Sequence, residues 1–305
     1  MKPNLALRIG KLKLKNPVMV ASGTFGEEYS RLVDINRLGA YVAKTITLKA
    51  RIGNPGPRIC ETPSGMLNSI GLENGGLGHF LKNKMPFLAK LKAPVIISLA
   101  GDDEDEFAEL VRRLTKIAHI DAFELNLSCP NIRYGSRECL IAQDEKATYE
   151  VIKKVRKMTP RTVIAKLSPN VTDIAKIAKA AEGAGADAIL LVNTFLGMAV
   201  DIETKRPKLG NIVGGLSGPA IKPLALRAAW SAYNSVKIPI IGAGGIMDYK
   251  DAIEFMLCGS SAIQVGTANF VNPKATAWII DGIKGYLEQN KIKNINEIIG
   301  GLKIG

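Results

Sequence analysis

A cysteine and two asparagines lie close together in the segment ELNLSCPN, residues 124–131. Residues 124–127 are typical of the end of a buried strand, after which the chain turns. A thiol at such a place can fill a core, form a disulfide, bind a metal or act in catalysis, so Cys129 alone decides nothing. The flanking amides of Asn126 and Asn131 favour a binding or catalytic site, because an ordinary strand end needs neither.

Polar residues and glycines also follow the other short apolar runs of the chain. Each alone has an ordinary explanation, because Asn and Gly form turns and Lys can reach solvent from a buried stem. Together they indicate a binding site, because the carboxyl ends of the strands in a parallel barrel face one mouth. The residues at these run ends are Ser22, Lys44, Thr45, Ser98, Asn126, Lys166, Asn193, Thr194, Gly244, Gly245, Gly266 and Thr267.

Two of these run ends are rich in glycine and predict where a phosphate would bind. The segments GAGGI (242–246) and QVGTA (264–268) follow the seventh and eighth runs. Glycine lets backbone N–H groups approach a phosphate closely, and barrels commonly hold phosphate in the loops after these two strands. The ligand is therefore expected to carry a phosphate, as many cofactors do.

Two lysines, Lys44 and Lys166, lie in otherwise apolar strands. A buried ammonium needs an anionic partner. A substrate carboxylate or an electron-rich cofactor ring would supply one, and a salt bridge to a glutamate inside the barrel, such as Glu124, is the alternative.

The elements that would position these residues are short strands alternating with amphipathic helices, which predict a parallel sheet. Eight such units predict one closed (β/α)8 TIM barrel, formed by residues 1–305 as a single domain. An open doubly wound sheet is the alternative, but no G-x-G-x-x-G opens a helix after the first strand. The predicted strands are 17–21, 41–44, 95–99, 122–127, 163–167, 188–192, 238–243 and 262–265, and the predicted helices are 104–118, 147–158, 171–184, 222–235 and 249–257.

The remaining segments are expected to be additions to this barrel. Residues 1–17 alternate apolar and basic side chains, which predicts a short N-terminal hairpin. Long insertions are expected after the second, fourth and sixth strands. Long connections in compact domains are usually functional, and in barrels the loops that follow the strands build the active site.

Composition limits the class of protein. The chain has 305 residues, of which 47% are hydrophobic, but its apolar runs are far shorter than the ~20 residues of a membrane helix. Its N-terminus has no signal-peptide pattern, so a cytoplasmic protein without membrane contact is expected. Four scattered cysteines and two histidines predict neither a disulfide framework nor a metal site. The net charge of +13 comes from dispersed lysines, so a nucleic-acid partner is not expected.

Long blocks of this sequence resemble one family of flavin enzymes, the class 1 dihydroorotate dehydrogenases, and most closely their subtype B catalytic subunit. The resemblance covers nearly the whole chain. Its blocks are NPVMVASGTFG (16–26), KTITLKARIGNPGPRICETPSGMLNSIGLEN (44–74), ELNLSCPN (124–131), AKLSPN (165–170), VNTFLGMAVDIETKRPKLGNIVGGLSGPAIKPLALR (192–227), IIGAGGI (240–246) and QVGTANF (264–270).

The resemblance implies an FMN-containing barrel that oxidises dihydroorotate to orotate in pyrimidine biosynthesis. Cys129 corresponds to the family's catalytic base. The positions that correspond to substrate contacts are Lys44, Asn68, Ser69, Ile70, Gly71, Leu72, Asn126, Asn193 and Thr194. Those that correspond to contacts with the single FMN are Ser22, Lys44, Thr45, Ser98, Asn126, Lys166, Val192, Gly218, Gly244, Gly245, Gly266 and Thr267. Ser98 departs from the usual Asn of subtype B, and serine is shorter than an amide.

The implied chemistry agrees with these residue types. Cys129 would remove the C5 proton while a hydride passes from C6 to N5 of FMN. A thiol with an ordinary pKa of about 8.5 is only partly ionised near neutrality, so its surroundings would have to assist it. The amides, with Lys44, would hold a planar carboxylated pyrimidine by fixed hydrogen bonds. Lys166 would stabilise the anion of the reduced flavin.

Subtype B also implies partners. An electron-transfer subunit with FAD and a [2Fe-2S] cluster would pass electrons to NAD+, in a heterotetramer built on a homodimer of catalytic chains. The alternatives are a fumarate-dependent subtype A enzyme, a dihydrouridine synthase acting on tRNA, and a barrel that binds flavin without turnover. The TFLGMAVD block (194–201) favours subtype B, and the NSIGLEN block (68–74) suits a small free pyrimidine.

Overall fold

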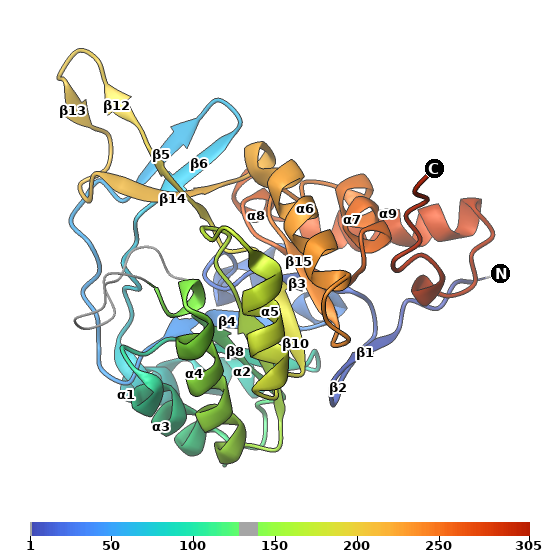
Figure 1. Ribbon diagram of the computed structural model, residues 1–305, viewed down its shortest axis with the longest axis horizontal. Helices are drawn as coiled ribbons and strands as arrows, with labels where there is room; N and C mark the ends of the chain where they lie inside the picture. Colours follow the sequence, from blue (N-terminus) through green and yellow to red (C-terminus); the bar gives the residue numbers. More distant parts are fainter. Residues whose placement is uncertain (1, 128–139) are drawn as a thin grey trace.

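Eight parallel strands form the centre of the molecule, in a computed structural model that describes residues 2–127 and 140–305 (Figure 1). Their order in the sheet is β3, β16, β15, β10, β9, β8, β7 and β4. The first and last of these, β3 and β4, come together just before β4 begins, where the N–H of Gly39 donates to the carbonyl of Val18 over 2.8 Å. The predicted (β/α)8 barrel is confirmed. The strands are β3 (Val18–Val20), β4 (Tyr41–Ile46), β7 (Val95–Leu99), β8 (Ala122–Asn126), β9 (Thr162–Lys166), β10 (Ala188–Leu191), β15 (Ile240–Ala243) and β16 (Ser260–Val265).

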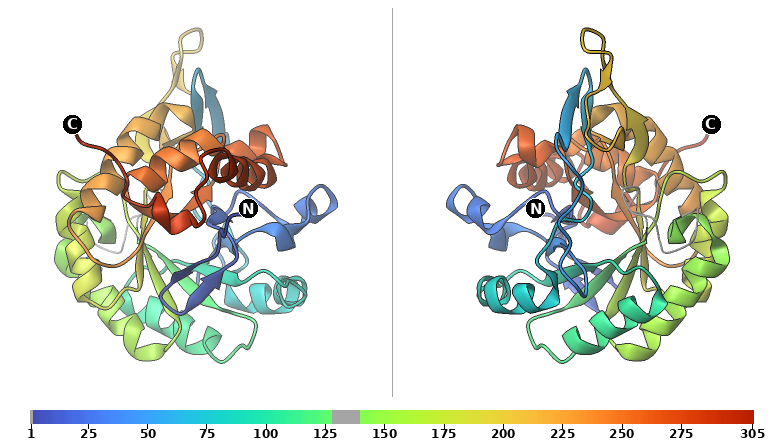
Figure 2. Two further views of the ribbon diagram at one scale, coloured as in Figure 1. Left: turned by 90° about the vertical axis from the view of Figure 1, so that its right-hand side faces the viewer. Right: turned by 90° about the vertical axis from the view of Figure 1, so that its left-hand side faces the viewer.

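Helices surround these strands in a ring (Figure 2). Several begin directly after an aspartate whose side chain accepts a backbone N–H of the first turn, at Asp103, Asp144, Asp173 and Asp248. Asp173 is the reason that the helix predicted from residue 171 begins only at Ile174. The ring helices are α3 (Glu104–Leu114), α4 (Glu145–Met158), α5 (Ile174–Gly183), α6 (Lys222–Tyr233), α7 (Tyr249–Leu257) and α9 (Ala275–Gln289), the last of which was not predicted.

Short helical segments complete the connections. The α-helical one after the eighth barrel strand is α8 (Ala268–Val271). The 3-10 turns are η1 (Glu27–Arg31), η2 (Ile35–Arg37), η3 (Ile141–Gln143), η4 (Pro219–Ile221) and η5 (Ile295–Glu297). No helix among residues 2–127 and 140–305 is long and apolar enough to cross a membrane.

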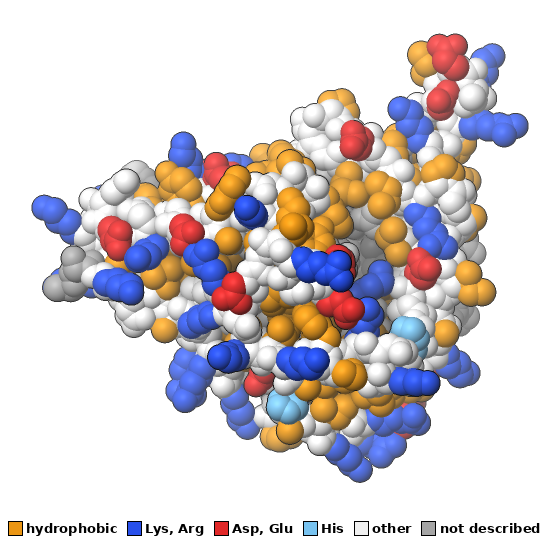
Figure 3. Space-filling view, turned by 180° about the vertical axis from the view of Figure 1, so that it is seen from behind, with side chains coloured by type: hydrophobic (Ala, Val, Ile, Leu, Met, Phe, Trp, Pro, Cys, Tyr) orange, Lys and Arg blue, Asp and Glu red, His pale blue; other side chains and the backbone are white. Residues whose placement is uncertain are grey.

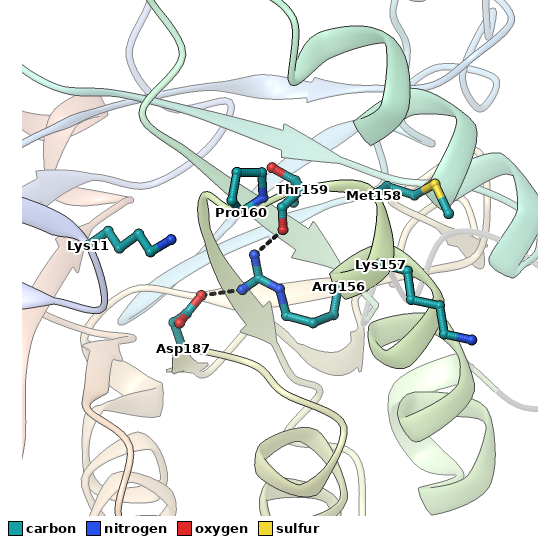
Figure 4. Close-up of a pocket in the computed structure, with 7 residues that line it drawn as sticks. All are labelled: Lys11, Arg156, Lys157, Met158, Thr159, Pro160 and Asp187. Atoms are coloured by element: carbon teal, nitrogen blue, oxygen red, sulfur yellow. Dashed lines mark hydrogen bonds and ion pairs between the residues drawn. The ribbon is translucent and has the colours of Figure 1, made fainter.

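The predicted N-terminal hairpin is present and covers the amino-terminal end of the barrel. Its strands β1 (Leu7–Ile9) and β2 (Leu12–Leu14) turn their leucines and isoleucine inward. At the turn, the N–H of Lys11 donates to Oγ1 of Thr162 over 3.0 Å. A hollow of about 520 Å³ beside this turn holds Arg156, whose guanidinium contacts Asp187 at 2.7 Å and points between Asp187 and Thr159 (Figure 4).

The insertions after the second and sixth barrel strands pair with each other. The first contains β5 (Ile59–Thr62), β6 (Gly65–Asn68), α1 (Gly76–Asn83) and α2 (Met85–Leu88), and the second contains β11 (Phe195–Met198), β12 (Val200–Asp201), β13 (Arg206–Pro207) and β14 (Val213–Ser217). Strands β11, β14, β6 and β5 form one antiparallel sheet. The β12–β13 hairpin projects beyond the barrel (Figures 1 and 2). Much of the segment expected as an insertion after the fourth strand, residues 128–139, lies outside the described residues.

Candidate active site

A cavity of about 370 Å³ lies at the carboxyl ends of the barrel strands. Most of the residues that line it are ones that the sequence singled out. The predicted residues that line it are Ser22, Lys44, Thr45, Asn68, Ile70, Gly71, Leu72, Asn126, Lys166, Val192, Asn193, Thr194, Gly218, Gly244, Gly245, Gly266 and Thr267. The expected convergence of strand ends on one site is therefore observed.

Two of the predicted residues do not line the cavity, and a third is not described. Cys129 lies outside the described residues. Ser69 is fully buried behind the cavity wall, where its hydroxyl has no hydrogen-bond partner among the described residues. Ser98 is also fully buried and does not line the cavity; its hydroxyl lies 2.9 Å from Oγ1 of Thr45. A ligand would thus meet Thr45 before it met Ser98.

The two predicted lysines differ in environment. Lys166 is buried as expected, with 7% of its surface exposed. Its Nζ lies 3.9 Å from Oε1 of Glu124, the glutamate that the sequence offered as an alternative to a ligand as its anionic partner. The expectation that Lys44 is buried was wrong. It occupies the one exposed position of β4 because its side chain leaves the strand at the cavity mouth.

Amide side chains form a cluster on one side of the cavity. Nδ2 of Asn126 donates to Oγ1 of Thr45 at 3.4 Å, and Nδ2 of Asn193 donates to Oδ1 of Asn126 at 3.4 Å. Oδ1 of Asn193 accepts the N–H of Thr194 at 2.9 Å. On the opposite insertion, Nδ2 of Asn68 donates to the carbonyl of Gly215 at 3.4 Å. The cluster thus combines donors and acceptors, which suits a flat polar ligand.

The loop that follows Asn68 has a backbone that only certain residues tolerate. Gly71 has φ of +72°, and a Cβ there would lie 2.6 Å from the backbone nitrogen of Asn54. Leu72 also adopts a positive φ of 53°. A glycine is therefore required for the chain to turn at this edge of the cavity, which explains the glycine of the NSIGL motif.

The glycine segments after β15 and β16 form a polar cradle. Gly244 and Gly245 have φ of +119° and +75°. Within the described part of the chain, the backbone N–H groups of Gly244, Gly245, Gly266 and Thr267 donate no hydrogen bond, although all four residues line the cavity. Unpaired, partly buried N–H groups are strong donors that favour an anion. This arrangement fits the predicted phosphate site.

The predicted site residues did not include three polar residues that line the cavity, Thr24, Ser217 and, most deeply buried of the three, Gln264. It lines the cavity from β16, is 1% exposed, and donates through Nε2 to Oε2 of Glu124 at 2.7 Å. Its Oε1 is buried without a hydrogen-bond partner in the described residues. The available signal was a lone amide inside the apolar run SAIQV (261–265), which a barrel interior would not otherwise need.

Apolar residues complete the walls and were not predicted either. They lie just after β3, in the first insertion, in η4, in and just after β15, and in α8, and comprise Ala21, Ile59, Met66, Ile221, Ala243, Ile246, Met247 and Phe270. Nothing in their residue type distinguishes them from ordinary core positions. In the described part of the chain no group of three or more His, Cys, Asp or Glu side chains is arranged to hold a metal ion.

Comparison with known proteins relates this site to one enzyme family. The family model for dihydroorotate dehydrogenase matches residues 4–287. The chain is 54% identical over 302 residues to a protein of Desulforamulus reducens named dihydroorotate dehydrogenase B (NAD(+)), catalytic subunit, covering 98% of this chain and 99% of that protein. Proteins of the same name from Trichlorobacter lovleyi and Thermoanaerobacter sp. are 51% and 50% identical over at least 99% of both chains. The chain therefore belongs to the dihydroorotate dehydrogenase family, among its B-type catalytic subunits.

Proposed function

We propose that this cavity is the active site in which the chain, a dihydroorotate dehydrogenase of pyrimidine biosynthesis, oxidises dihydroorotate to orotate with bound FMN. The observation that carries the proposal is the shared cavity itself. Backbone N–H groups that have no partner in the described residues, a buried lysine and a cluster of amides line one space of about 370 Å³. That combination provides a phosphate site, a site for an electron-rich ring and a site for a small polar substrate.

The residues present fit FMN at both of its ends. The N–H groups of Gly244, Gly245, Gly266 and Thr267 would hold the phosphate. Lys166 and Oε1 of Gln264, which has no partner in the described part of the chain, would meet the polar edge of the ring, one as a donor and one as an acceptor. When bound, FMN supplies the acceptor for the hydride that the substrate loses.

The amide cluster and the NSIGL loop would hold the substrate. Asn68 belongs to one insertion, whereas Asn193 follows a barrel strand, so their amides would hold a planar ring from two separate elements. Lys44 at the exposed mouth would pair with the substrate carboxylate. Fixed hydrogen bonds of this kind hold the substrate in one orientation relative to the groups that react with it, and such positioning supplies a large part of catalysis.

Cys129 is proposed as the base that removes the C5 proton. It lies outside the described residues, so the support for this role is its place in the ELNLSCPN motif, three residues beyond Asn126. The test is the rate of flavin reduction by dihydroorotate in Cys129→Ala, followed without oxygen from pH 6 to 9. We expect a large loss at every pH, and a wild-type rate above neutral pH would show that another group is the base.

The electron acceptor is proposed to be NAD+, reached through a partner subunit that carries FAD and a [2Fe-2S] cluster. The support is the name shared by the similar proteins, which calls each of them the catalytic subunit of an NAD(+)-linked enzyme. Two catalytic chains and two electron-transfer chains would form the assembly. Rapid reduction of fumarate by the isolated chain with dihydroorotate would instead indicate a subtype A enzyme.

The decisive experiment is an anaerobic titration of the purified chain with dihydroorotate. A yellow protein whose flavin absorption bleaches at once supports cofactor, substrate and the first half of the reaction together. A yellow protein that stays yellow would contradict the substrate, and a colourless protein that does not bind added FMN would contradict the cofactor.

The face of the molecule shown in Figure 3 gives no support to a tRNA substrate. Lys and Arg side chains are dispersed over the face shown in Figure 3, with acidic and apolar side chains between them. Recognition of nucleic acid requires a continuous basic surface that follows the phosphate backbone.

A further inference from the structure

Glu124 is a fully buried carboxylate below the cavity floor. It lies two residues before Asn126 in β8, so both side chains face the barrel interior. Among the described residues, three polar side chains contact it. Ser98 donates its hydroxyl to Oε1 at 2.9 Å, Gln264 donates Nε2 to Oε2 at 2.7 Å, and Nζ of Lys166 lies 3.9 Å from Oε1.

A carboxylate only accepts hydrogen bonds, so Glu124 fixes the direction of every bond around it. Gln264 must turn its NH2 group toward Glu124, which leaves Oε1 as a buried acceptor with no partner among the described residues. Ser98 must donate to Glu124, so its oxygen is left to accept from the Thr45 hydroxyl 2.9 Å away.

The chain of hydroxyls continues to the cavity surface. With the Thr45 proton directed at Ser98, the Thr45 oxygen is left to accept, and the Ser22 hydroxyl lies 2.9 Å from it. If the Ser22 hydroxyl donates its proton to Thr45, its oxygen can act only as an acceptor toward the cavity. The orientation of the Thr45 and Ser22 hydroxyls is thus set by the charge of Glu124, which is linked to Thr45 by two hydrogen bonds through Ser98.

We propose that Glu124 is a positioning residue that holds the Lys166 ammonium in place and sets the pattern of donors and acceptors on the cavity floor. The inference rests on the proposed binding of FMN. A ring whose polar edge carries carbonyl oxygens beside an N–H would then meet an ammonium donor and an amide oxygen acceptor at fixed positions. Because these groups are oriented in advance, they need not reorganise when charge develops on the ring.

Glu124 also balances the charge of Lys166. Without the carboxylate, the buried ammonium would act on the ligand uncompensated, and an anionic, reduced ring would gain more than a neutral, oxidised one. In Glu124→Gln, the ratio of the dissociation constant of oxidised FMN to that of reduced FMN should rise about tenfold, the order expected for the loss of one buried charge near a ligand. Lys166→Met should lower the same ratio.

A first experiment tests the pairing without any cofactor. Urea unfolding of the FMN-free chain is measured for the wild type, Glu124→Gln, Lys166→Met and the double variant. Removing one partner of a buried ion pair costs more than removing both, so the double variant should unfold at a higher urea concentration than Glu124→Gln alone. If the losses of the two single variants simply add, the two residues are not coupled and the proposal fails.

A second experiment measures the binding ratio with a matched control. Asp187→Asn removes the carboxylate of a partly buried ion pair with Arg156 (Figure 4), beside the hairpin that covers the amino-terminal end of the barrel. It should lower stability and leave the FMN ratio unchanged. An unchanged ratio in Glu124→Gln would overturn the proposal. If the wild-type chain binds no FMN at all, the proposed function fails, while the unfolding cycle still decides whether Glu124 and Lys166 act together.

Discussion

The side-chain amide of Asn193 donates a hydrogen bond to Oδ1 of Asn126 over 3.4 Å. Asn126 ends β8 and Asn193 follows β10, and these two strands flank β9, whose last residue is Lys166. The bond therefore links two strands that are not neighbours in the sheet, beside the end of the strand between them. It holds amides of the proposed substrate site in a defined orientation relative to the buried lysine.

Replacing Asn193 should impair substrate binding more than cofactor binding. In Asn193→Ala, we expect kcat/KM for dihydroorotate to fall about 10- to 100-fold, the loss of one or two hydrogen bonds to a charged ligand. FMN content should remain near that of the wild type. Asn234→Ala, at the exposed residue that follows α6, is the control and should leave both unchanged. Loss of FMN with an unchanged KM would assign Asn193 to the cofactor instead.

Replacing Gly245 should remove the phosphate cradle. Gly245 has φ of +75°, and a Cβ there would lie 2.7 Å from Cβ of Lys222. Gly245→Ala should therefore lower the free energy of unfolding by about 1–2 kcal/mol and weaken FMN binding, because the backbone must move.

Gly285→Ala is the matched control for this substitution. Gly285 lies inside α9, and a Cβ there would meet nothing within 4 Å. This variant should be as stable as the wild type or more stable by up to about 1 kcal/mol, with normal FMN content. Unfolding in urea and the flavin absorbance of the purified proteins measure both effects. Normal FMN binding in Gly245→Ala would contradict the proposed cradle.

The salt bridge beneath the cradle should give a pH-dependent stability at high pH. Nζ of Lys222 lies 2.7 Å from Oδ1 of Asp251, and this hydrogen bond raises the pKa of Lys222 above its ordinary value of 10.5. A raised lysine pKa stabilises the fold below the unfolded pKa, and this contribution is lost as pH rises through the folded pKa.

The measurement is the difference in urea midpoint between the wild type and Lys222→Met as a function of pH. It should be constant from neutral pH up to the ordinary lysine pKa of 10.5 and shrink above it. Using the difference removes the titration of other groups that both proteins share. A difference that stays constant through this range would mean that the ion pair does not contribute to stability.

Replacing Ser98 distinguishes a structural role from a direct contact with the cofactor. Ser98 is fully buried and bridges Thr45 and Glu124. Ser98→Ala should lower the free energy of unfolding by about 1–3 kcal/mol, because a buried charge loses a donor. The dissociation constant of FMN should change less than tenfold. A larger change, without a corresponding loss of stability, would indicate that Ser98 touches the cofactor.

The sequence by itself determined the barrel and most of the cavity lining. The β-branched runs and the amphipathic segments between them are local patterns, and eight alternations close a parallel sheet in only a few ways. Once the strands are placed, Thr45, Asn126 and Lys166 must lie at one end, because parallel strands end together. The glycines of the cradle could be predicted for the same reason.

Only the tertiary structure decided the contacts between distant segments. Strand β6 pairs with β14, so that Asn68 lies opposite Gly215, and nothing local in either insertion predicts that partner. The placement of Glu124 among Ser98, Gln264 and Lys166 depends on the stagger of four strands, as do the burial of Ser98 and the exposure of Lys44. Local residue patterns specify which elements form and which face is apolar, whereas hydrogen-bond partners inside a barrel are set by the register between strands far apart in sequence.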